Sequence, residues 1–307
     1  MAIAYISHPS CQLHDMGSHH PEQPARLAAI NDRMIASGLD MALLHHDAPR
    51  ATREQLLAAH SAAHVDSIQR LSPTQGMAAI DGDTSMNSHS LEAALRAAGA
   101  AVMAVDLVMA GQAGQAFCAV RPPGHHAEHN RAMGFSLFNN VAVAARHALQ
   151  HYGLQRVAIV DFDVHHGNGT EDIVAGDERI LFCSTFQHPF YPHSGYDSDA
   201  ANVVNVPLAA GSGGAEFRAA VEQHWLPRLR DFAPQLLLVS AGFDAHSGDP
   251  LANMNLVDED FAWVTRCLCE QAERSAGGKL VSTLEGGYDL HALARSVEAH
   301  LKAFLGD

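Results

Sequence analysis

The stretch Val157-Ala-Ile-Val-Asp-Phe-Asp-Val-His-His-Gly-Asn-Gly169 joins an apolar run to a polar turn that is punctuated by glycine. Every residue of Val157–Val160 is apolar, which is typical of a strand buried on both faces of a sheet. Because side chains alternate along an extended chain, Asp161, Asp163 and His165 share one direction. If the extended run reaches residue 165, a carboxylate and an imidazole project side by side at the carboxyl edge of the sheet. This pair would supply the first two ligands of a divalent metal.

Apolar, β-rich runs alternate with helical patterns along the rest of the chain. We expect strands at 2–7, 42–45, 116–120, 156–162, 180–185, 203–207, 235–241 and 279–284. We expect helices at 22–37, 53–70, 90–110, 137–151, 214–231, 257–275 and 290–305. Alternation on this scale predicts a mostly parallel sheet with helices on both faces. Since no repeat, low-complexity tract or linker interrupts the pattern, the sequence predicts one domain over residues 1–307.

The longest irregular segments lie between these elements, and several of them follow strands. They are 8–25, 72–89, 121–134, 186–202 and 242–256. Long loops in a compact α/β domain often carry function. In open α/β sheets, ligands bind beyond the carboxyl ends of the strands. The sequence therefore predicts a functional site at that edge of the sheet.

Composition limits the classes of function that the chain can have. It carries 19 basic and 34 acidic residues, a net charge of −15, which disfavours direct binding of nucleic acid. The same charge favours a cationic substrate over long range, although solubility alone also accounts for it. The chain has no long apolar run and no signal peptide, so we expect no membrane association. Five scattered cysteines without a spacing pattern predict reduced thiols and a cytoplasmic location.

A second polar segment, Ser240–His246, follows the predicted strand at 235–241 and contains Asp244. Asp244 would add a third ligand to Asp163 and His165. One histidine and two carboxylates leave an open position for water, as a catalytic zinc site requires. Loop aspartates also cap helices and close turns, so either segment alone is more simply explained in that way.

Two more segments after predicted strands supply acid–base groups. In Arg121–His129, a Pro-Pro-Gly turn is followed by two adjacent histidines, which either act as acid–base groups or form a solvated pair. In Leu284–Asp289, two glycines permit close backbone approach, and Tyr288 either points its hydroxyl into a site or packs as a lid on the sheet. All four segments would meet at one edge of the sheet, and this convergence favours a catalytic site.

Taken in order, these segments resemble the histone deacetylase family. The resemblance rests on Arg121–Ala127, Asp161–Thr170, Ala241–Asp244 with Gly248–Pro250, Glu285–Tyr288, His20–Leu27 and His60–Val65. The class II branch is the closer match because of the RPPGHHA motif and Asn168. The matches run in order over most of the chain, which makes the signal highly specific.

The resemblance implies a three-layer α/β/α arginase–deacetylase fold with an eight-stranded, mostly parallel sheet. It implies a catalytic Zn²⁺ held by Asp163, His165 and Asp244, with Fe²⁺ as an ion that suits the same ligands. It also implies a structural K⁺ that is bound mostly through backbone carbonyls. The residues near this K⁺ would be Asp161, Asp163, His165, Ser184 and Thr185.

The resemblance further implies a role for each polar side chain around the metal. His126 would be the general base, His125 the electrostatic partner near the oxyanion and the leaving amine, and Tyr288 the hydrogen-bond donor to the oxyanion. Asp161 would lie behind His125, and Asn168 behind His126. Because an amide does not attract a proton as a carboxylate does, we expect His126 to be neutral at rest.

An acyl-lysine tunnel is also implied by the resemblance. Its lining residues would be Gly134, Phe135, Tyr191, Leu251, Gly286 and Gly287. Tyr191 stands where the family usually has phenylalanine, which adds a polar edge to one wall. Asp83 matches the rim residue that grips the substrate backbone, and Arg26 would line the exit for acetate.

Leu251 bears on the choice of substrate. Polyamine-selective class II members carry a glutamate just after the Gly-Asp-Pro turn, so a leucine there favours acetyl-lysine in a peptide or protein. The acidic net charge slightly favours acetylated polyamines, which stay as the alternative together with other small acylated amines. The sequence leaves the acyl length and the oligomeric state open, a homo-oligomer included.

Two remote alternatives complete the set. A binuclear manganese ureohydrolase of the same fold needs a further bridging carboxylate where this chain has Gly242, so a second metal lacks its ligands. A non-catalytic protein that only binds acylated amines needs neither a base nor an oxyanion donor. The presence of both kinds of group favours an enzyme, a zinc-dependent deacetylase acting on linear amides.

Overall fold

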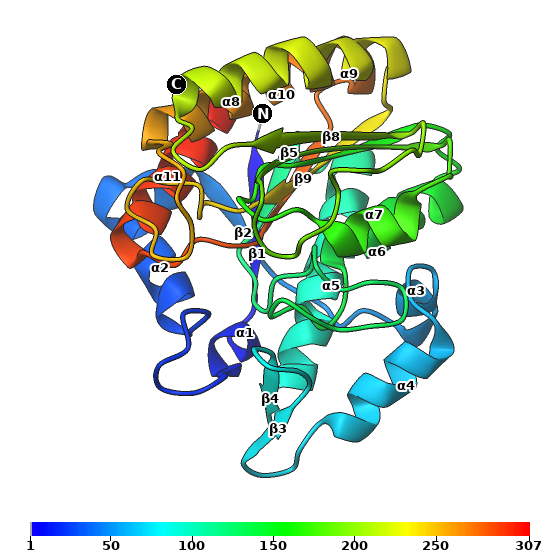
Figure 1. Ribbon diagram of the computed structural model, residues 1–307, viewed down its shortest axis with the longest axis vertical. Coiled ribbons are helices and arrows are strands. Elements are labelled where there is room, and N and C mark those ends of the chain that lie inside the picture. The colour runs from blue at the N-terminus through cyan, green and yellow to red at the C-terminus, as the bar shows by residue number, and fades with distance from the viewer. Residues whose placement is uncertain (1) are drawn as a thin grey trace.

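A computed structural model describes residues 2–307 (Figure 1). Its central feature is an eight-stranded sheet with the order β2-β1-β5-β10-β9-β6-β7-β8, in which every neighbouring pair is parallel. The strands are β1 (Ile3–Ser7), β2 (Leu43–Asp47), β5 (Gln115–Cys118), β6 (Val157–Asp161), β7 (Ile180–Gln187), β8 (Val203–Leu208), β9 (Leu236–Ala241) and β10 (Leu280–Leu284). All eight predicted strands are present, and the predicted parallel sheet is confirmed.

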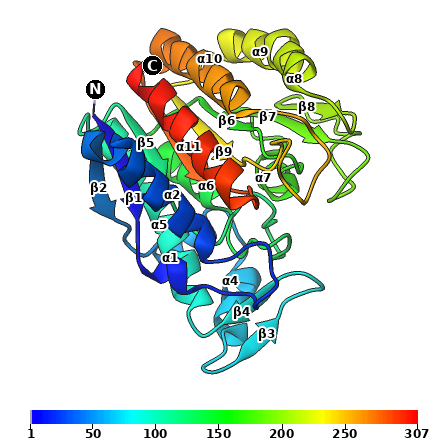
Figure 2. The ribbon, with the colours of Figure 1, turned by 90° about the vertical axis from the view of Figure 1, so that its left-hand side faces the viewer.

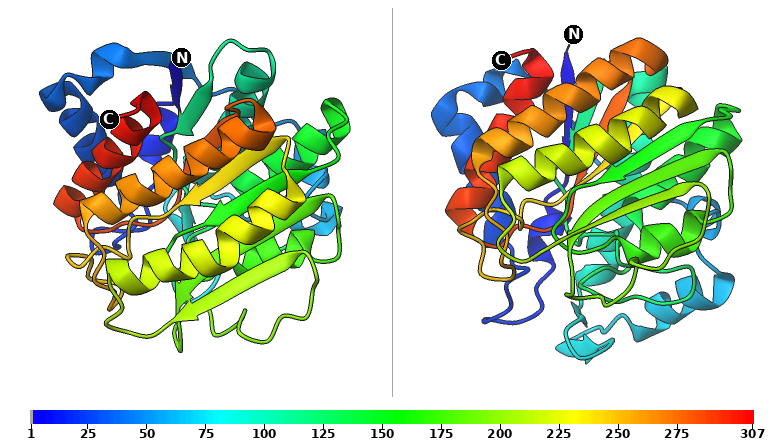
Figure 3. Two further views of the ribbon diagram at one scale, coloured as in Figure 1. Left: turned by 90° about the horizontal axis from the view of Figure 1, so that it is seen from above. Right: turned by 45° about the horizontal axis from the view of Figure 1, so that its top comes forward.

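Helices cover both faces of this sheet and make three layers (Figure 2). One face is covered by α5 (Ser90–Met109) and α6 (Asn140–His151). The other face carries α2 (Ala25–Ser37), α8 (Gly214–Ala220), the π-helical η2 (Val221–Trp225), α9 (Leu226–Phe232), α10 (Asp258–Ala276) and α11 (Leu290–Leu305). Figure 3 shows α10 and the stretch from α8 to α9 lying across that face. Strands β6, β7, β9 and β10 are buried at every position because they lie between these two layers.

The register of the central strands places their carboxyl ends together. Asp161, the last residue of β6, pairs with Ser184 of β7 and Ser240 of β9. The loops that follow β5, β6, β9 and β10 therefore leave the sheet at one edge. These four loops carry the polar segments that the sequence singled out.

Helix boundaries differ from the predictions where a capping side chain sets them. The predicted helix at 53–70 is two helices, α3 (Arg53–Leu57) and α4 (Ala62–Leu71), because the Ser61 side chain accepts a hydrogen bond from the His64 N–H and starts a new helix. Helix α6 begins at Asn140 because Asn139 caps it in the same way. Within residues 2–307, no helix combines the length and the apolar character that crossing a bilayer requires.

Four short elements lie wholly outside the predicted helices and strands. They are α1 (Ser10–Leu13), the antiparallel pair β3 (Met77–Ala79) and β4 (Ser85–Asn87), and α7 (Asn168–Val174). Elements of three to seven residues contain too few turns or alternations to give a periodic signal, so the sequence did not indicate them.

Candidate active site

Three buried side chains meet at the carboxyl ends of β6 and β9. Asp163 and His165 follow β6, Asp244 follows β9, and their ligand atoms all lie within 4.8 Å of one another. His165 Nδ1 lies 3.1 Å from Asp163 Oδ1 and 3.2 Å from Asp244 Oδ2. Two buried carboxylates this close are costly unless a cation or a proton neutralises them. Two carboxylates and one imidazole are a donor set that fits a catalytic divalent metal such as zinc.

The two carboxylates strongly influence the protonation of this triad. Burial alone would lower the pKa of His165, but the carboxylates of Asp163 and Asp244, which accept hydrogen bonds from its ring, raise it to about 10. Burial and the charge of Asp163 raise the pKa of Asp244 to about 7. The triad therefore attracts positive charge, and a divalent metal would take the place of the protons held there.

Backbone N–H groups hold the two carboxylates in place. Asp163 Oδ1 accepts a hydrogen bond from the His165 N–H at 2.9 Å, and Asp163 Oδ2 accepts one from the Gly286 N–H at 2.8 Å. Asp244 Oδ1 accepts one from the Val164 N–H at 2.9 Å. Such contacts fix the orientation of the ligands before a metal binds.

Two glycines leave the space that the carboxylates occupy. A Cβ atom at Gly286 would lie 2.1 Å from Asp244 Oδ2, and one at Gly242 would lie 2.0 Å from Asp163 Oδ2. Neither position has room for a side chain. The bridging carboxylate that a binuclear ureohydrolase would need at residue 242 is therefore sterically excluded.

Two histidines face the triad from the loop that follows β5. His125 Nδ1 lies 2.9 Å from Asp161 Oδ2, and His126 Nδ1 lies 2.7 Å from Asn168 Oδ1. The other ring nitrogen of His125, Nε2, lies 3.7 Å from Asp163 Oδ2. Both histidines are thus bound by the partners that the resemblance implied.

Their surroundings shift the pKa values of the two imidazoles in opposite directions. Burial alone would lower the pKa of His125, but the carboxylates of Asp163 and Asp161 raise it well above its usual range. Burial lowers the pKa of His126, and the neighbouring His125 and His165 lower it further. These surroundings favour the protonated form of His125 and the neutral form of His126, and enzymes separate an acid from a base in this way.

Tyr288 enters the site from the loop that follows β10. The Arg26 guanidinium lies 5.0 Å from the centre of the Tyr288 ring, and it donates hydrogen bonds to the carbonyls of Gly287 and Glu285 at 2.6 Å each. The Tyr288 N–H donates to Asp249 Oδ2 at 2.6 Å. Burial raises the pKa of Tyr288 well above its usual range, so the hydroxyl keeps its hydrogen and can donate a hydrogen bond.

A pocket of about 250 Å³ reaches His165 of the triad. It is lined by Asp83, His126, Gly134, Phe135, His165, Phe190, Tyr191, Leu251 and Tyr288. This set includes the expected rim residue Asp83 and four of the expected tunnel residues. Gly286 and Gly287 do not line the pocket, because Gly286 lies against the carboxylates of the triad and Gly287 against Leu293 and Phe243. Phe190 adds an aromatic wall that stacks on His165 with a ring-centre distance of 5.6 Å.

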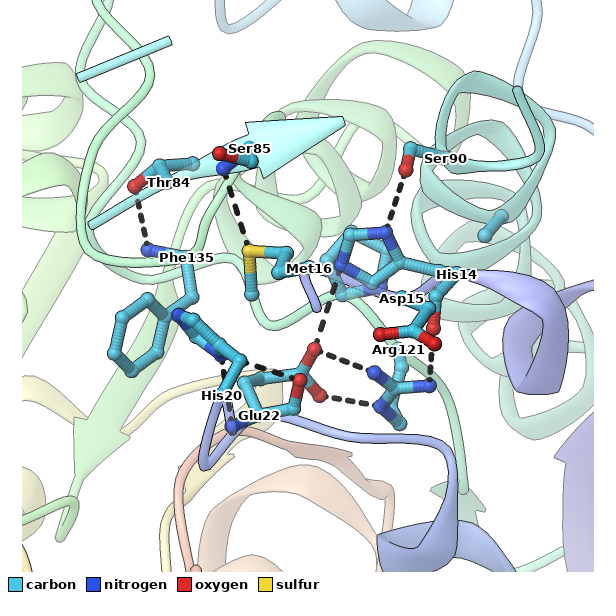
Figure 4. Close-up of polar contacts among 12 residues, drawn as sticks. His14, Asp15, Met16, His20, Glu22, Thr84, Ser85, Ser90, Arg121 and Phe135 are labelled. Atoms are coloured by element: carbon cyan, nitrogen blue, oxygen red, sulfur yellow. Dashed lines mark hydrogen bonds and ion pairs between the residues drawn. The ribbon is translucent and has the colours of Figure 1, made fainter. Parts of the chain in front are cut away.

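The pocket wall that carries Phe135 lies against His126. Gly134 and Phe135 both have positive φ angles, 55° and 66°. A Cβ atom at Gly134 would lie 2.4 Å from Cδ2 of His126. The Phe135 N–H donates to Thr84 Oγ1 at 3.0 Å, and the His20 ring meets Phe135 edge-on (Figure 4). The turn therefore places the pocket wall against the His126 ring.

Sequence reasoning missed a buried ion cluster behind the site. Glu22 accepts hydrogen bonds from both Arg26 and Arg121, and the latter contact is drawn in Figure 4. Burial alone would raise the pKa of Glu22, but Arg121 holds it well below its usual range. Arg121 begins the loop that carries the two histidines, whereas Arg26 contacts the loop of Tyr288. Glu22 thus joins the loop of His125 and His126 to the loop of Tyr288. Its partner Arg121 lies 99 residues away in sequence, so no local signal could have shown the contact.

The strand register places some of the residues that are expected around a K⁺ ion beside one another. Asp161 and Ser184 are partners across β6 and β7, and Thr185 follows Ser184 in β7. Asp163 and His165 lie directly beyond the end of β6. K⁺ binding by these residues stays a prediction, as does the role of Arg26 in acetate release.

Comparisons with known proteins identify the family to which this chain is similar. The family model for the histone deacetylase domain matches residues 20–304. The histone deacetylase-like amidohydrolase of Pseudomonas aeruginosa is 39% identical over 88% of this chain and 72% of its own length. The polyamine deacetylase HDAC10 of Mus musculus is 38% identical over 97% of this chain and 46% of its own.

The solved structures also contain a similar fold. The crystal structure of the HDA15 HD domain superposes with a TM-score of 0.94 at 34% identity, covering 100% of this chain and 88% of that domain. The arginase–deacetylase fold expected from the sequence is thereby confirmed. Because the family model spans almost the whole chain and the fold agrees, this chain belongs to the histone deacetylase family of deacetylases and amidohydrolases.

Proposed function

We propose that this protein is a zinc-dependent deacetylase that hydrolyses acylated amines, with acetyl-lysine in a peptide or protein as its preferred substrate. One observation carries the proposal. His165 of the buried triad lines one pocket together with a neutral imidazole, His126, and a protonated phenol, Tyr288. A protein that only bound acylated amines would need neither of these last two groups.

Asp163, His165 and Asp244 would hold the ion. Zinc in such a site polarises an amide carbonyl and makes water a stronger acid, and Fe²⁺ suits the same donors. The triad supports this proposal because its carboxylates are buried, already oriented by backbone N–H groups and in need of a neutralising cation.

The other side chains would divide the proton transfers among themselves. Neutral His126 accepts a proton from the attacking water at Nε2. Cationic His125, paired with Asp161, places positive charge beside the oxyanion and the leaving amine. Tyr288 donates its hydroxyl hydrogen to the oxyanion, a contribution of about 3 to 4 kcal/mol for one such donor.

The pocket walls support a long, largely apolar acyl-amine chain as the substrate. Phe135, Phe190, Tyr191 and Leu251 suit the methylene stem of an acylated lysine. Asp83 at the rim would accept hydrogen bonds from the peptide backbone of the substrate. Arg26 would line the path by which acetate leaves the site.

An acetylated polyamine is the second candidate substrate. The net charge of −15 attracts a polycation, and one relative described above is named a polyamine deacetylase. Leu251 argues against it, because a neutral side chain at the pocket wall offers no partner to a second ammonium group.

Acetate release from an acetyl-lysine peptide and from acetylspermidine, measured side by side with zinc-loaded protein, tests the proposal. We expect the larger kcat/KM with the peptide. Leu251→Glu should shift the preference toward acetylspermidine, whereas Leu251→Gln, which has a similar size and no charge, should not. A wild-type preference for acetylspermidine would overturn the choice of substrate but leave the chemistry intact. A lack of turnover with both substrates would refute the proposed deacetylase activity.

We also propose a structural K⁺ near Asp161, Asp163, His165, Ser184 and Thr185. The register that brings Asp161 beside Ser184 supports it. The thermal midpoint should be higher in KCl than in choline chloride at equal ionic strength, and equal midpoints would contradict the site.

A further inference from the structure

A glutamate lies behind the proposed base, separated from it by one amide. Glu128 Oε1 accepts a hydrogen bond from Asn168 Nδ2 at 2.7 Å, and Asn168 Oδ1 lies 2.7 Å from His126 Nδ1. Asn168 is buried, with 8% of its surface exposed, and its Nδ2 also lies 3.4 Å from Met133 Sδ. A continuous chain of contacts therefore runs from Glu128 through the amide to His126.

The chemistry of this chain determines which way the amide points. A carboxylate and a thioether only accept hydrogen bonds, whereas an amide has one donor end and one acceptor end. Glu128 and Met133 therefore require Nδ2 on their side and leave Oδ1 of Asn168 to face the imidazole. Because Oδ1 is an acceptor, His126 must carry its hydrogen on Nδ1, and the lone pair on Nε2 is free.

A rotated amide would have the opposite effect. Turning the Asn168 side chain by half a turn would place Oδ1 against the Glu128 carboxylate, so two acceptors would meet without a hydrogen between them. It would also present Nδ2 to His126 Nδ1, which would then have to accept. The hydrogen of the ring would move to Nε2, and the base would lose its lone pair.

Glu128 is itself held in place. Its backbone N–H donates to the Arg131 carbonyl at 2.8 Å, and its own carbonyl lies 2.9 Å from Nδ1 of His60. Arg131 Nη2 donates to Oε1 of Glu128 at 3.1 Å. The carboxylate thus meets Asn168 from a fixed position, although it does not line the pocket.

We propose that Glu128 is a positioning residue that selects the Nδ1–H tautomer of His126 through the Asn168 amide. The inference rests on the proposed function, in which Nε2 of His126 accepts a proton. Glu128 does not line the pocket, and its hydrogen-bonded connection to His126 runs through Asn168.

A double-mutant comparison separates this role from a merely structural one. Glu128→Ala should lower kcat by about 10-fold or more, with KM and zinc content little changed. Glu128→Gln, which keeps an acceptor oxygen, should recover much of the loss.

In an Asn168→Asp background, both side-chain oxygens accept, so either orientation keeps the Nδ1–H tautomer. There, Glu128→Ala should not lower kcat further and should raise it if the two carboxylates repel each other. Equal losses in both backgrounds would overturn the inference.

The tautomer also has a readout that does not depend on catalysis. Two-bond ¹H–¹⁵N correlations show which ring nitrogen carries the hydrogen, and the His126 signals are assigned by their absence from a His126→Ala spectrum. In zinc-loaded protein we expect Nδ1–H in the wild type and a shift toward Nε2–H in Glu128→Ala. An unchanged Nδ1–H signal in Glu128→Ala would refute the role of Glu128. If the wild type releases no acetate, the proposed function fails, whereas the spectra still decide the inference.

Discussion

At the scale of the residue, His125 and His126 are neighbours whose pKa values are shifted in opposite directions. The carboxylates of Asp163 and Asp161 raise the pKa of His125 against the effect of burial, whereas burial and the neighbouring His125 and His165 lower the pKa of His126. The Nδ1 atoms of the two rings meet a carboxylate at Asp161 and an amide at Asn168. The pair of histidines could be predicted from the turn that precedes them, and their partners only from the resemblance to a family. The contribution of Glu128 could not be predicted, because its contact with Asn168 depends on how the two loops pack.

Tyr288 provides the sharpest test at this scale. Tyr288→Phe removes the hydroxyl but keeps the ring that packs under Arg26. We expect kcat to fall by on the order of 10² to 10³, because one donor to the oxyanion is lost, with zinc content unchanged. Acetate release and elemental analysis of the same sample would check this. A rate near that of the wild type would remove Tyr288 from the mechanism.

At the scale of the element, strands were easier to predict than the short pieces between them. Continuous apolar runs such as Val157–Val160 identify a strand covered on both faces, and β6 contains that run. The hairpin of β3 and β4 has only three residues in each strand, so no alternation could indicate it. Its Thr84 nevertheless supports the pocket wall through Phe135.

The turn at Gly134 gives a prediction at the scale of the element. Gly134→Ala adds a methyl group within 2.4 Å of the His126 ring at a φ of +55°. Gly153→Ala is the matched control, because Gly153 has a φ of +65° and nothing within 4 Å of the added atom. Both variants should lose roughly 1 kcal/mol of stability from backbone strain, and Gly134→Ala more because of the clash.

Only Gly134→Ala should also lose activity, because only there does the new atom displace the base. Urea unfolding and acetate release, measured on both variants, compare the two effects. Similar activity in the two variants would mean that the turn does not hold His126 in place.

At the scale of the whole molecule, the sequence predicted the number of strands and their parallel direction. It did not predict the order β2-β1-β5-β10-β9-β6-β7-β8, because an apolar run shows that a strand is buried but not which strand lies beside it. The resemblance supplied the eight-stranded architecture. The ion cluster around Glu22 depends on the same long-range order, since it joins segments from both ends of the chain.

The buried His300 makes the stability of the whole molecule depend on pH. It lies between Thr265 and Ser282, and burial lowers its pKa from 6.5 to about 3. The unfolded chain therefore binds a proton that the folded protein does not, and stability falls as the pH decreases from 6.5 toward 3. At pH 5 this difference in proton binding lowers the free energy of unfolding by about 2 kcal/mol.

The variant His300→Gln isolates this effect, because glutamine stays neutral over the same range. Urea unfolding of both zinc-loaded proteins at pH 7.5 and pH 5 would measure it. We expect the wild type to lose about 2 kcal/mol more than the variant on acidification. Equal losses would show that His300 does not contribute to the acid sensitivity.

The central claim is that the triad of Asp163, His165 and Asp244 binds one metal ion on which amide hydrolysis depends. The most direct measurement is acetate release from an acetyl-lysine peptide by protein stripped with a chelator and then titrated with Zn²⁺, with Asp244→Asn treated in the same way. We predict no turnover in the stripped wild type, full recovery at about one equivalent of zinc, and neither recovery nor bound zinc in Asp244→Asn. Turnover in the stripped protein, or full recovery in Asp244→Asn, would contradict the claim.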